Sequence, residues 1–299
     1  NLIWLFIARV ITGIFSGNLS VCLATISDLS LTEKAKARNF GFLSVLAGFS
    51  FILGAFIGGK FSDSTVSSFF TPSFPFMLAA LLSFINLFFI IFAFKEPTEE
   101  KKYVKFDVLE GIHNIQKALK TKNIKTIYVI YFLFVFAWTI LFQFSPVLVI
   151  KKFAFTNSQI GDLAAFMGIC WAIGSWPINK LLSKWFSPLR ILDVAFLIFT
   201  VLCGLVGFPK HLQGVIIILG ACVIIGGLAW PLCTTVISNR APHKMQGKIM
   251  GMSQSMQSLA MAVSPIIGGL FDRVHIYLPF LVAAFASLIA GAIYFRTKI

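Results

Sequence analysis

The chain has 299 residues and a formal net charge of +14, with 58% hydrophobic and only 12% charged residues. Soluble domains carry about 25% charged residues, so this composition excludes a soluble enzyme and a soluble nucleic-acid binder. Intrinsic disorder is excluded too, because that state needs low hydrophobicity. The remaining class is an all-α membrane protein whose chain crosses the bilayer many times.

The hydrophobic runs predict where the chain crosses. A helix needs about 20 apolar residues to span a bilayer core of about 30 Å. Nine runs meet this length, and none alternates in the manner of a membrane barrel. The sequence therefore predicts nine transmembrane helices, at residues 2–27, 39–60, 74–94, 124–150, 158–182, 190–208, 212–238, 247–270 and 276–295.

The basic residues between the spans predict the orientation. One alternate set of gaps, which includes the C-terminal tail, holds 19 Lys and Arg residues, and the other set holds 5. Because basic loops stay in the cytoplasm, the first set is expected inside. This places residue 1 outside and the C-terminus inside, in the plasma membrane of a bacterium.

The longest gap divides the chain into two helical bundles. Residues 1–95 form a partial three-helix bundle, residues 96–123 a cytoplasmic linker, and residues 124–299 a six-helix bundle. Within the linker, residues 106–119 have apolar side chains at helical spacing. This pattern fits an amphipathic helix on the inner membrane face, and a solvated linker helix fits it equally well.

An internal repeat relates the two bundles. The segments Arg38 to Gly41 and Gly54 to Gly59 reappear as Lys248 to Gly251 and Ser264 to Gly269, at a constant offset of 210 up to the paired glycines. Two halves built on one template are typical of a transporter.

At these motifs the chain resembles the major facilitator superfamily. Leu5-x-x-x-Arg9-x-x-Thr12-Gly13 looks like that family's fourth-helix pattern, which usually has Gln at the position of Thr12. The pattern from Gly41 to Gly59 is similar to the fifth-helix signature of drug:proton antiporters, with Ser50 in place of a glycine and Ala55 in place of a proline. The resemblance implies a two-bundle fold that begins at the family's fourth helix, so that the first three helices are absent.

The resemblance also implies a function. A secondary active transporter is expected, moving a small lipophilic or aromatic molecule by alternating access in a proton-coupled efflux cycle. Because of the two departures in the fifth-helix signature, a proton-coupled nutrient uptake symporter is an alternative function. Because of the missing helices, a transport-incompetent fragment is a further alternative. An enzyme is not expected, because the spans lack paired carboxylates, a Ser/His pair and metal-ligand clusters. No cofactor or metal is expected, and the protein is expected to be a monomer that binds substrate, protons and lipid.

Arg9 is the only ionisable residue deep inside a predicted span. A charge there costs roughly 2.5–3.5 kcal/mol on insertion scales, so it needs a partner or water. Because Thr12 and Ser16 share its helical face, we expect Arg9 to face a cavity and to act on substrate or on a proton-binding group. Snorkelling of Arg9 to the lipid headgroups is the alternative.

The family resemblance places cavity walls on the spans at 2–27, 124–150 and 212–238. Their aromatic residues and few polar anchors suit a lipophilic or aromatic substrate. The candidate residues on the second and third of these spans are Tyr131, Trp138, Gln143, Trp230 and Thr234.

A second group of residues is expected to serve gating and helix packing. Asp28 is expected to pair with Arg38 or Lys34 as a strut, and Asp162 to stabilise the start of its helix rather than to carry a proton. Small residues let helices approach closely, and a proline bends a helix. The expected packing and bending positions are Gly54, Gly58, Gly59, Pro265, Gly268 and Gly269.

Overall fold

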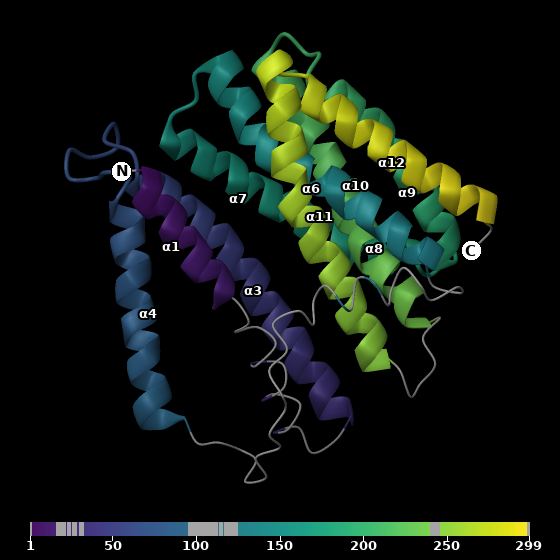
Figure 1. The fold of residues 1–299 in the computed structure, drawn as a ribbon, viewed down its shortest axis with the longest axis horizontal. Coiled ribbons are helices and arrows are strands. Elements are labelled where there is room, and N and C mark those ends of the chain that lie inside the picture. Colours follow the sequence, from purple (N-terminus) through teal and green to yellow (C-terminus); the bar gives the residue numbers. More distant parts are fainter. Residues whose placement is uncertain are drawn as a thin grey trace. The chain divides into compact units, whose positions relative to one another are not determined.

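The computed structural model describes residues 2–15, 33–94, 125–239 and 246–297, together with five isolated positions at 22, 25, 29, 113 and 116. Within these residues the regular structure is helical (Figure 1). The prediction of an all-α chain is therefore confirmed.

The helices follow the predicted spans in chain order. The first three are α1 (Leu2–Ile14), α3 (Glu33–Phe61) and α4 (Phe74–Ala93). Next, α6 (Lys125–Phe153) precedes a rod in which α7 (Asn157–Ile173) runs through the π-helical segment η1 (Gly174–Ile178) into α8 (Asn179–Leu182). The last four are α9 (Pro188–Leu205), α10 (Leu212–Asn239), α11 (Gln246–Val274) and α12 (Leu278–Thr297). Counting the rod once, the described residues contain the nine predicted helical segments.

Five of these helices, α4, α6, α9, α10 and α12, are long and apolar enough to cross a membrane among the residues described. Shorter apolar stretches occur in α1 and at the end of α3, at Ile3–Ile14 and Gly48–Phe61. The other segments do not combine this length with this apolar character, for local reasons. The description of α1 stops before its predicted end, η1 interrupts the rod after α7, and α11 carries many Ser and Gln side chains.

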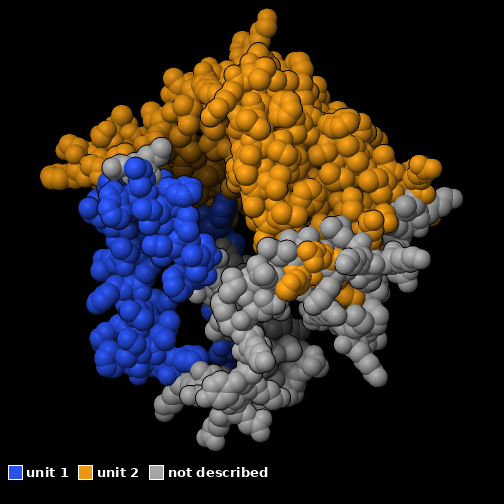
Figure 2. Space-filling model, viewed as in Figure 1, with its two compact units in different colours: residues 1–51, 73–105 blue, residues 52–72, 106–299 orange. Residues whose placement is uncertain are grey.

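The described structure divides into two compact units, residues 1–51 with 73–105 and residues 52–72 with 106–299 (Figure 2). In the first unit, α4 buries no residue and exposes a continuous run of Phe, Leu and Ile side chains. In the second unit, α6 is central and packs against α11 and α12, while α9 packs on α10 and α12, and α7 packs on α10. The last part of α3, from Ile52 onward, groups with this second unit.

The core of the second unit lies along α6. The side chains of Tyr128, Phe134 and Leu141 are fully buried there. Buried residues lie all around α6, which is typical of a helix enclosed by other helices. Such a helix offers several faces from which side chains can reach its neighbours, and the candidate site is built on it.

Candidate functional site

Four aromatic side chains on α6 and α10 meet in one group, which we call the aromatic cluster: Tyr131, Phe134, Trp138 and Trp230. The Trp230 ring lies 6.2 Å from Tyr131, 6.2 Å from Phe134 and 6.4 Å from Trp138, each at an edge-to-face angle. Such geometry is favourable for aromatic pairs. Trp230 is only partly buried, whereas the other three are buried. It is therefore the member that is accessible from outside the core.

A glycine on α10 makes the aromatic cluster possible. A Cβ atom at Gly226 would lie 2.2 Å from the Trp138 ring. Only a residue without a side chain fits at this position, one turn before Trp230. Pro231 follows, and its carbonyl accepts a hydrogen bond from the Thr234 hydroxyl at 2.8 Å. The hydroxyl of Thr234 is therefore engaged within its own helix.

Gln257 on α11 connects the aromatic cluster to a polar group. The hydroxyl of Tyr131 donates a hydrogen bond to Gln257 Oε1 at 3.0 Å. A buried tyrosine needs a partner for its hydroxyl, and Gln257 supplies it while remaining partly exposed. Sequence reasoning missed this residue. The available signal was the polar character of α11, where Gln254 and Gln257 lie among several serines.

Two polar residues of α6, Thr139 and Gln143, do not join the aromatic cluster. Thr139 is buried and donates to the Val135 carbonyl of its own helix at 2.7 Å. Gln143 is exposed and lies about 140° around the helix from Trp138. Gln143 is thus directed away from the aromatic cluster.

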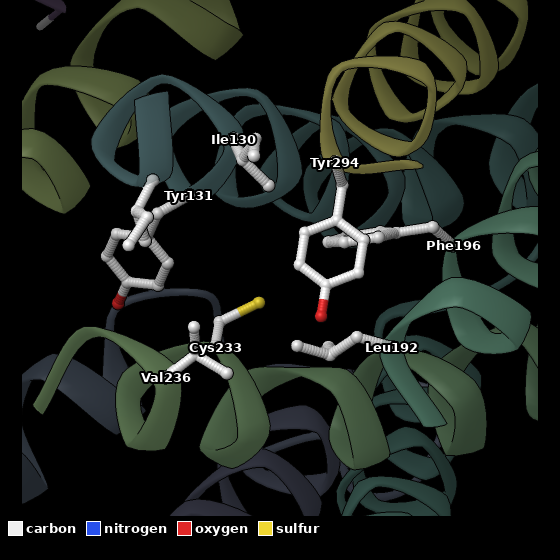
Figure 3. A pocket seen from close by; sticks show the side chains of 8 residues that line it. Ile130, Tyr131, Leu192, Phe196, Cys233, Val236 and Tyr294 are labelled. Carbon is white, nitrogen blue, oxygen red and sulfur yellow. The ribbon is translucent and has the colours of Figure 1, made fainter. Parts of the chain in front are cut away.

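A small cavity lies beside Tyr131, between α6, α9, α10 and α12 (Figure 3). Its volume is about 10 Å³, enough for about one water molecule. Its walls are apolar side chains and the rings of Tyr131, Phe196 and Tyr294, and the Tyr294 hydroxyl bonds to the Leu189 carbonyl at 3.2 Å. Ligand pockets measure about 300–1,000 Å³, so this cavity cannot hold a substrate in the packing observed.

The candidate residues near the N-terminus are only partly described. Arg9 and Thr12 are exposed on α1, no described residue pairs with Arg9, and the Thr12 hydroxyl donates to the Ala8 carbonyl at 2.7 Å. Ser16 and Asp28 lie outside the described residues, as does most of the predicted amphipathic helix at 106–119. Arg38 lies in α3. Among the residues described, no group of His, Cys, Asp and Glu could hold a metal ion.

The end of α3 touches the start of α7 backbone to backbone. A Cβ atom added to Gly59 would lie 2.5 Å from the Gly161 Cα atom. This Gly59–Gly161 contact therefore needs a glycine on both helices. At Gly54 and Gly58, by contrast, an added Cβ would meet no described atom within 4 Å. Close approach is thus found at Gly59 alone among these three glycines.

Charged groups surround the Gly59–Gly161 contact. The Lys60 ammonium lies 2.8 Å from Asp162 Oδ2 and donates to the Ser158 hydroxyl at 2.7 Å. Asp162 therefore pairs with Lys60, while the start of α7 is capped by Thr156, whose side chain accepts from the Gln159 backbone N–H. The expectation that Asp162 serves the helix start is corrected accordingly: a threonine three residues before Gln159 forms a capping box there.

Asp63 completes this connection from the loop after α3. Its Oδ1 atom accepts from the Thr65 hydroxyl at 2.6 Å and from the Thr65 backbone N–H at 2.9 Å. Its Oδ2 atom accepts from the Ser158 backbone N–H at 2.8 Å. These bonds, above all the one from the Thr65 hydroxyl, hold the pKa of Asp63 well below its ordinary value. Asp63 is therefore ionised at neutral pH and satisfies an N–H group at the start of α7.

The repeat counterpart in α11 packs differently. A Cβ atom at Gly268 would lie 2.3 Å from the Phe144 ring of α6, whereas one at Gly269 would meet no described atom within 4 Å. Pro265 is exposed within α11. At the end of the helix, Asp272 Oδ2 pairs with the Lys151 ammonium at 2.7 Å, and Asp272 Oδ1 is buried without a hydrogen-bond partner among the described residues.

Comparisons with known proteins agree with this architecture. The family model described as Major Facilitator Superfamily matches residues 1–226 and 127–298. Multidrug resistance protein 1 of Bacillus subtilis (strain 168) is 27% identical over 297 residues, covering 97% of this chain and 72% of that protein. The class H tetracycline resistance protein of Pasteurella multocida is 24% identical over 270 residues, covering 88% of this chain and 64% of that protein. The chain thus spans about two thirds of the length of these relatives.

The fold is similar to that of a solved transporter. The crystal structure of the human organic anion transporter MFSD10 (TETRAN) matches 97% of this chain and 70% of its own length, with a TM-score of 0.62 at 17% identity. Family and fold indicate a multi-pass membrane protein of a transporter class. On this match over most of its length, the chain belongs to the Major Facilitator Superfamily.

Proposed function

We propose that this protein exports small lipophilic or aromatic molecules by alternating access, in exchange for protons. The observation that carries the proposal is the aromatic cluster with its polar neighbour Gln257, set in a transporter fold. Trp230 offers a partly exposed aromatic surface, and the Tyr131–Gln257 hydrogen bond places polar groups beside it. The names of the multidrug and tetracycline resistance relatives agree with substrates of this kind.

In this proposal two groups of residues take part in transport. In the first group, Trp138, Trp230 and Tyr131 supply apolar and aromatic contacts, and Thr234 follows Trp230 by one helical turn. In the second group, Arg9, Thr12 and Ser16 act on substrate or on a proton-binding group from the predicted span at 2–27. Arg9 would act on an anionic substrate group or favour the ionised form of a proton-binding carboxylate.

The contact between α3 and α7 would close one end of the pathway. We propose that residues 1–95 and 124–299 act as the two moving bundles, joined by the linker at 96–123. The Gly59–Gly161 contact, the Lys60–Asp162 pair and the Asp63 bonds would separate when the opposite conformation forms. Asp28, Arg38, Gly54, Gly58, Pro265, Gly268 and Gly269 would serve the same movement. The distribution of basic residues supports a cytoplasmic C-terminus, which places this contact at the outer face.

A transport assay in everted vesicles tests the proposal. Energised vesicles that contain the protein should accumulate a lipophilic fluorescent dye, and accumulation should collapse when the proton gradient is removed. Trp230→Ala and Gln257→Ala should slow accumulation about tenfold each, whereas Trp185→Ala, which removes an exposed tryptophan between α8 and α9, should leave the rate unchanged.

The direction of dye movement separates export from uptake. Dye that leaves the energised vesicles would contradict export and favour a proton-coupled uptake symporter. Dye that does not respond to the proton gradient would contradict proton coupling. Equal rates for Trp230→Ala and the unaltered protein would contradict the assigned binding surface.

A further inference from the structure

An open groove at the inner end of the α7–α8 rod combines aromatic, apolar and basic side chains. Trp176, Pro177, Lys180, Leu181 and Lys184 line it, and its volume is about 290 Å³. Trp176 and Leu181 are 74% and 57% exposed. These five residues, which we call the α8 groove, are separate from the aromatic cluster and from the Gly59–Gly161 contact.

The local backbone explains how the α8 groove forms. Pro177 lacks a backbone N–H, and the helix widens into the π-helical turn η1 around it. Gly174 lets this turn press against α10, since a Cβ atom there would lie 1.9 Å from the Ile224 carbonyl oxygen. Trp176 and Pro177 lie in η1, Lys180 and Leu181 lie in α8, and Lys184 lies in the turn after α8, and all five line the same groove.

The lysines of the α8 groove lack counter-charges among the described residues. No described carboxylate pairs with Lys180 or Lys184, although salt bridges occupy the lysines Lys60 and Lys151 elsewhere. Two unpaired ammonium groups beside exposed Trp and Leu side chains favour a ligand that is both anionic and apolar. Tryptophan at the membrane interface and basic residues on the cytoplasmic side provide this chemistry for acidic lipids.

We propose that the α8 groove binds one anionic phospholipid, with its phosphate between Lys180 and Lys184 and an acyl chain along Trp176, Pro177 and Leu181. The site lies at the end of the rod where α9 begins, which is the cytoplasmic leaflet in the proposed orientation. It is a lipid site outside the transport pathway, and its occupancy does not depend on what the protein transports.

Native mass spectrometry of the purified full chain tests the proposal. The probes are phosphatidylglycerol and phosphatidylcholine with the same acyl chains. The protein should retain phosphatidylglycerol preferentially. Each of Lys180→Gln and Lys184→Gln should weaken its binding about fivefold, and the double variant about 25-fold. Trp176→Ala should weaken the binding of both lipids, because it removes the contact with the acyl chain.

Two matched variants control for overall charge. Lys125→Gln removes an exposed lysine at the start of α6, and Lys210→Gln removes one from the loop between α9 and α10. Neither should change phosphatidylglycerol binding, and melting temperatures of all variants should match that of the unaltered protein. Equal retention of the two lipids would overturn the proposal. So would unchanged binding in the double variant, or an equal loss in Lys125→Gln, which would show a response to overall charge alone.

Discussion

The two copies of the repeated Gly-Gly segment, at the ends of α3 and α11, have similar sequences and opposite packing. In α3 the second glycine, Gly59, meets the backbone of α7 at Gly161, while Gly58 is open. In α11 the first glycine, Gly268, meets the ring of Phe144, while Gly269 is open. The repeat therefore preserves the helix but not the face that packs.

The acidic residue after each Gly-Gly pair differs in the same way. Asp63 accepts three hydrogen bonds and connects α3 to the start of α7. Asp272 forms an ion pair with Lys151, and its other oxygen has no partner among the described residues. The same sequence segment therefore packs backbone to backbone where the neighbouring helix has a glycine, and against a side chain where the neighbouring helix has a phenylalanine.

Replacing the second glycine of each pair by alanine should give the largest difference in stability loss between the two copies of the repeat. Gly59→Ala places a methyl group against the Gly161 backbone, which cannot move aside, and should destabilise the protein by about 1–3 kcal/mol. Gly269→Ala, at the equivalent position, should change the melting temperature little. Thermal unfolding in detergent, followed by tryptophan fluorescence, measures both. Equal effects would show that the Gly59–Gly161 contact does not form.

Replacing the first glycine of each pair by alanine should destabilise the α11 copy more than the α3 copy, and the difference in stability loss should be smaller. Gly268→Ala crowds the Phe144 ring, which can shift in part, so we expect a loss of about 1 kcal/mol. Gly58→Ala should be neutral in the same unfolding assay. A larger loss for Gly58→Ala than for Gly268→Ala would reverse the comparison.

The two aspartates should differ in how stability depends on pH. Asp63 has a folded-state pKa below its unfolded-state value, so its contribution is present above the unfolded pKa of about 4 and is lost as pH falls toward the folded pKa. Asp63→Asn should therefore lower the melting temperature at pH 7. Below about pH 4, the melting temperature of this variant should decrease less with falling pH than that of the unaltered protein. Thr65→Val should do the same to a smaller extent. A melting curve of Asp63→Asn with unchanged acid dependence would contradict the assigned bonds.

The ion pairs should contribute least. In the Lys60–Asp162 pair the side chains are 29% and 46% exposed, so solvent screens their attraction. A double-mutant cycle with Lys60→Ala and Asp162→Ala should give a coupling of about 0.2–1 kcal/mol that decreases with added salt. A coupling as large as the effect of Gly59→Ala would mean that charge, and not backbone contact, holds α3 to α7.

Much of the fold could be predicted from hydrophobic run length. The predicted spans 74–94 and 212–238 correspond to Phe74–Ala93 and Leu212–Asn239. Run length is reliable because every backbone group in a bilayer must be satisfied within the helix. The family motifs also identified the fold, because the pattern that ends in the paired glycines recurs in the second half of the chain.

The contacts between helices could not be predicted in the same way. Apolar spans have weak helical patterning, so the sequence does not say which face of α3 meets which neighbour. Lys60, Gly161 and Gln257 were missed because each matters through a partner far away in the sequence. The proposed roles of Ser16 and Asp28 stay predictions, because both lie outside the described residues.

Cross-linking α3 to α7 tests most directly whether this contact opens during transport. A variant with Lys60→Cys and Asp162→Cys can be joined by a short bifunctional methanethiosulfonate, with the Lys60→Cys single variant as control. The joined protein should stop moving dye in everted vesicles, reductant should restore transport, and the treated control should stay active. Full transport by the joined protein would show that the contact between α3 and α7 does not need to open.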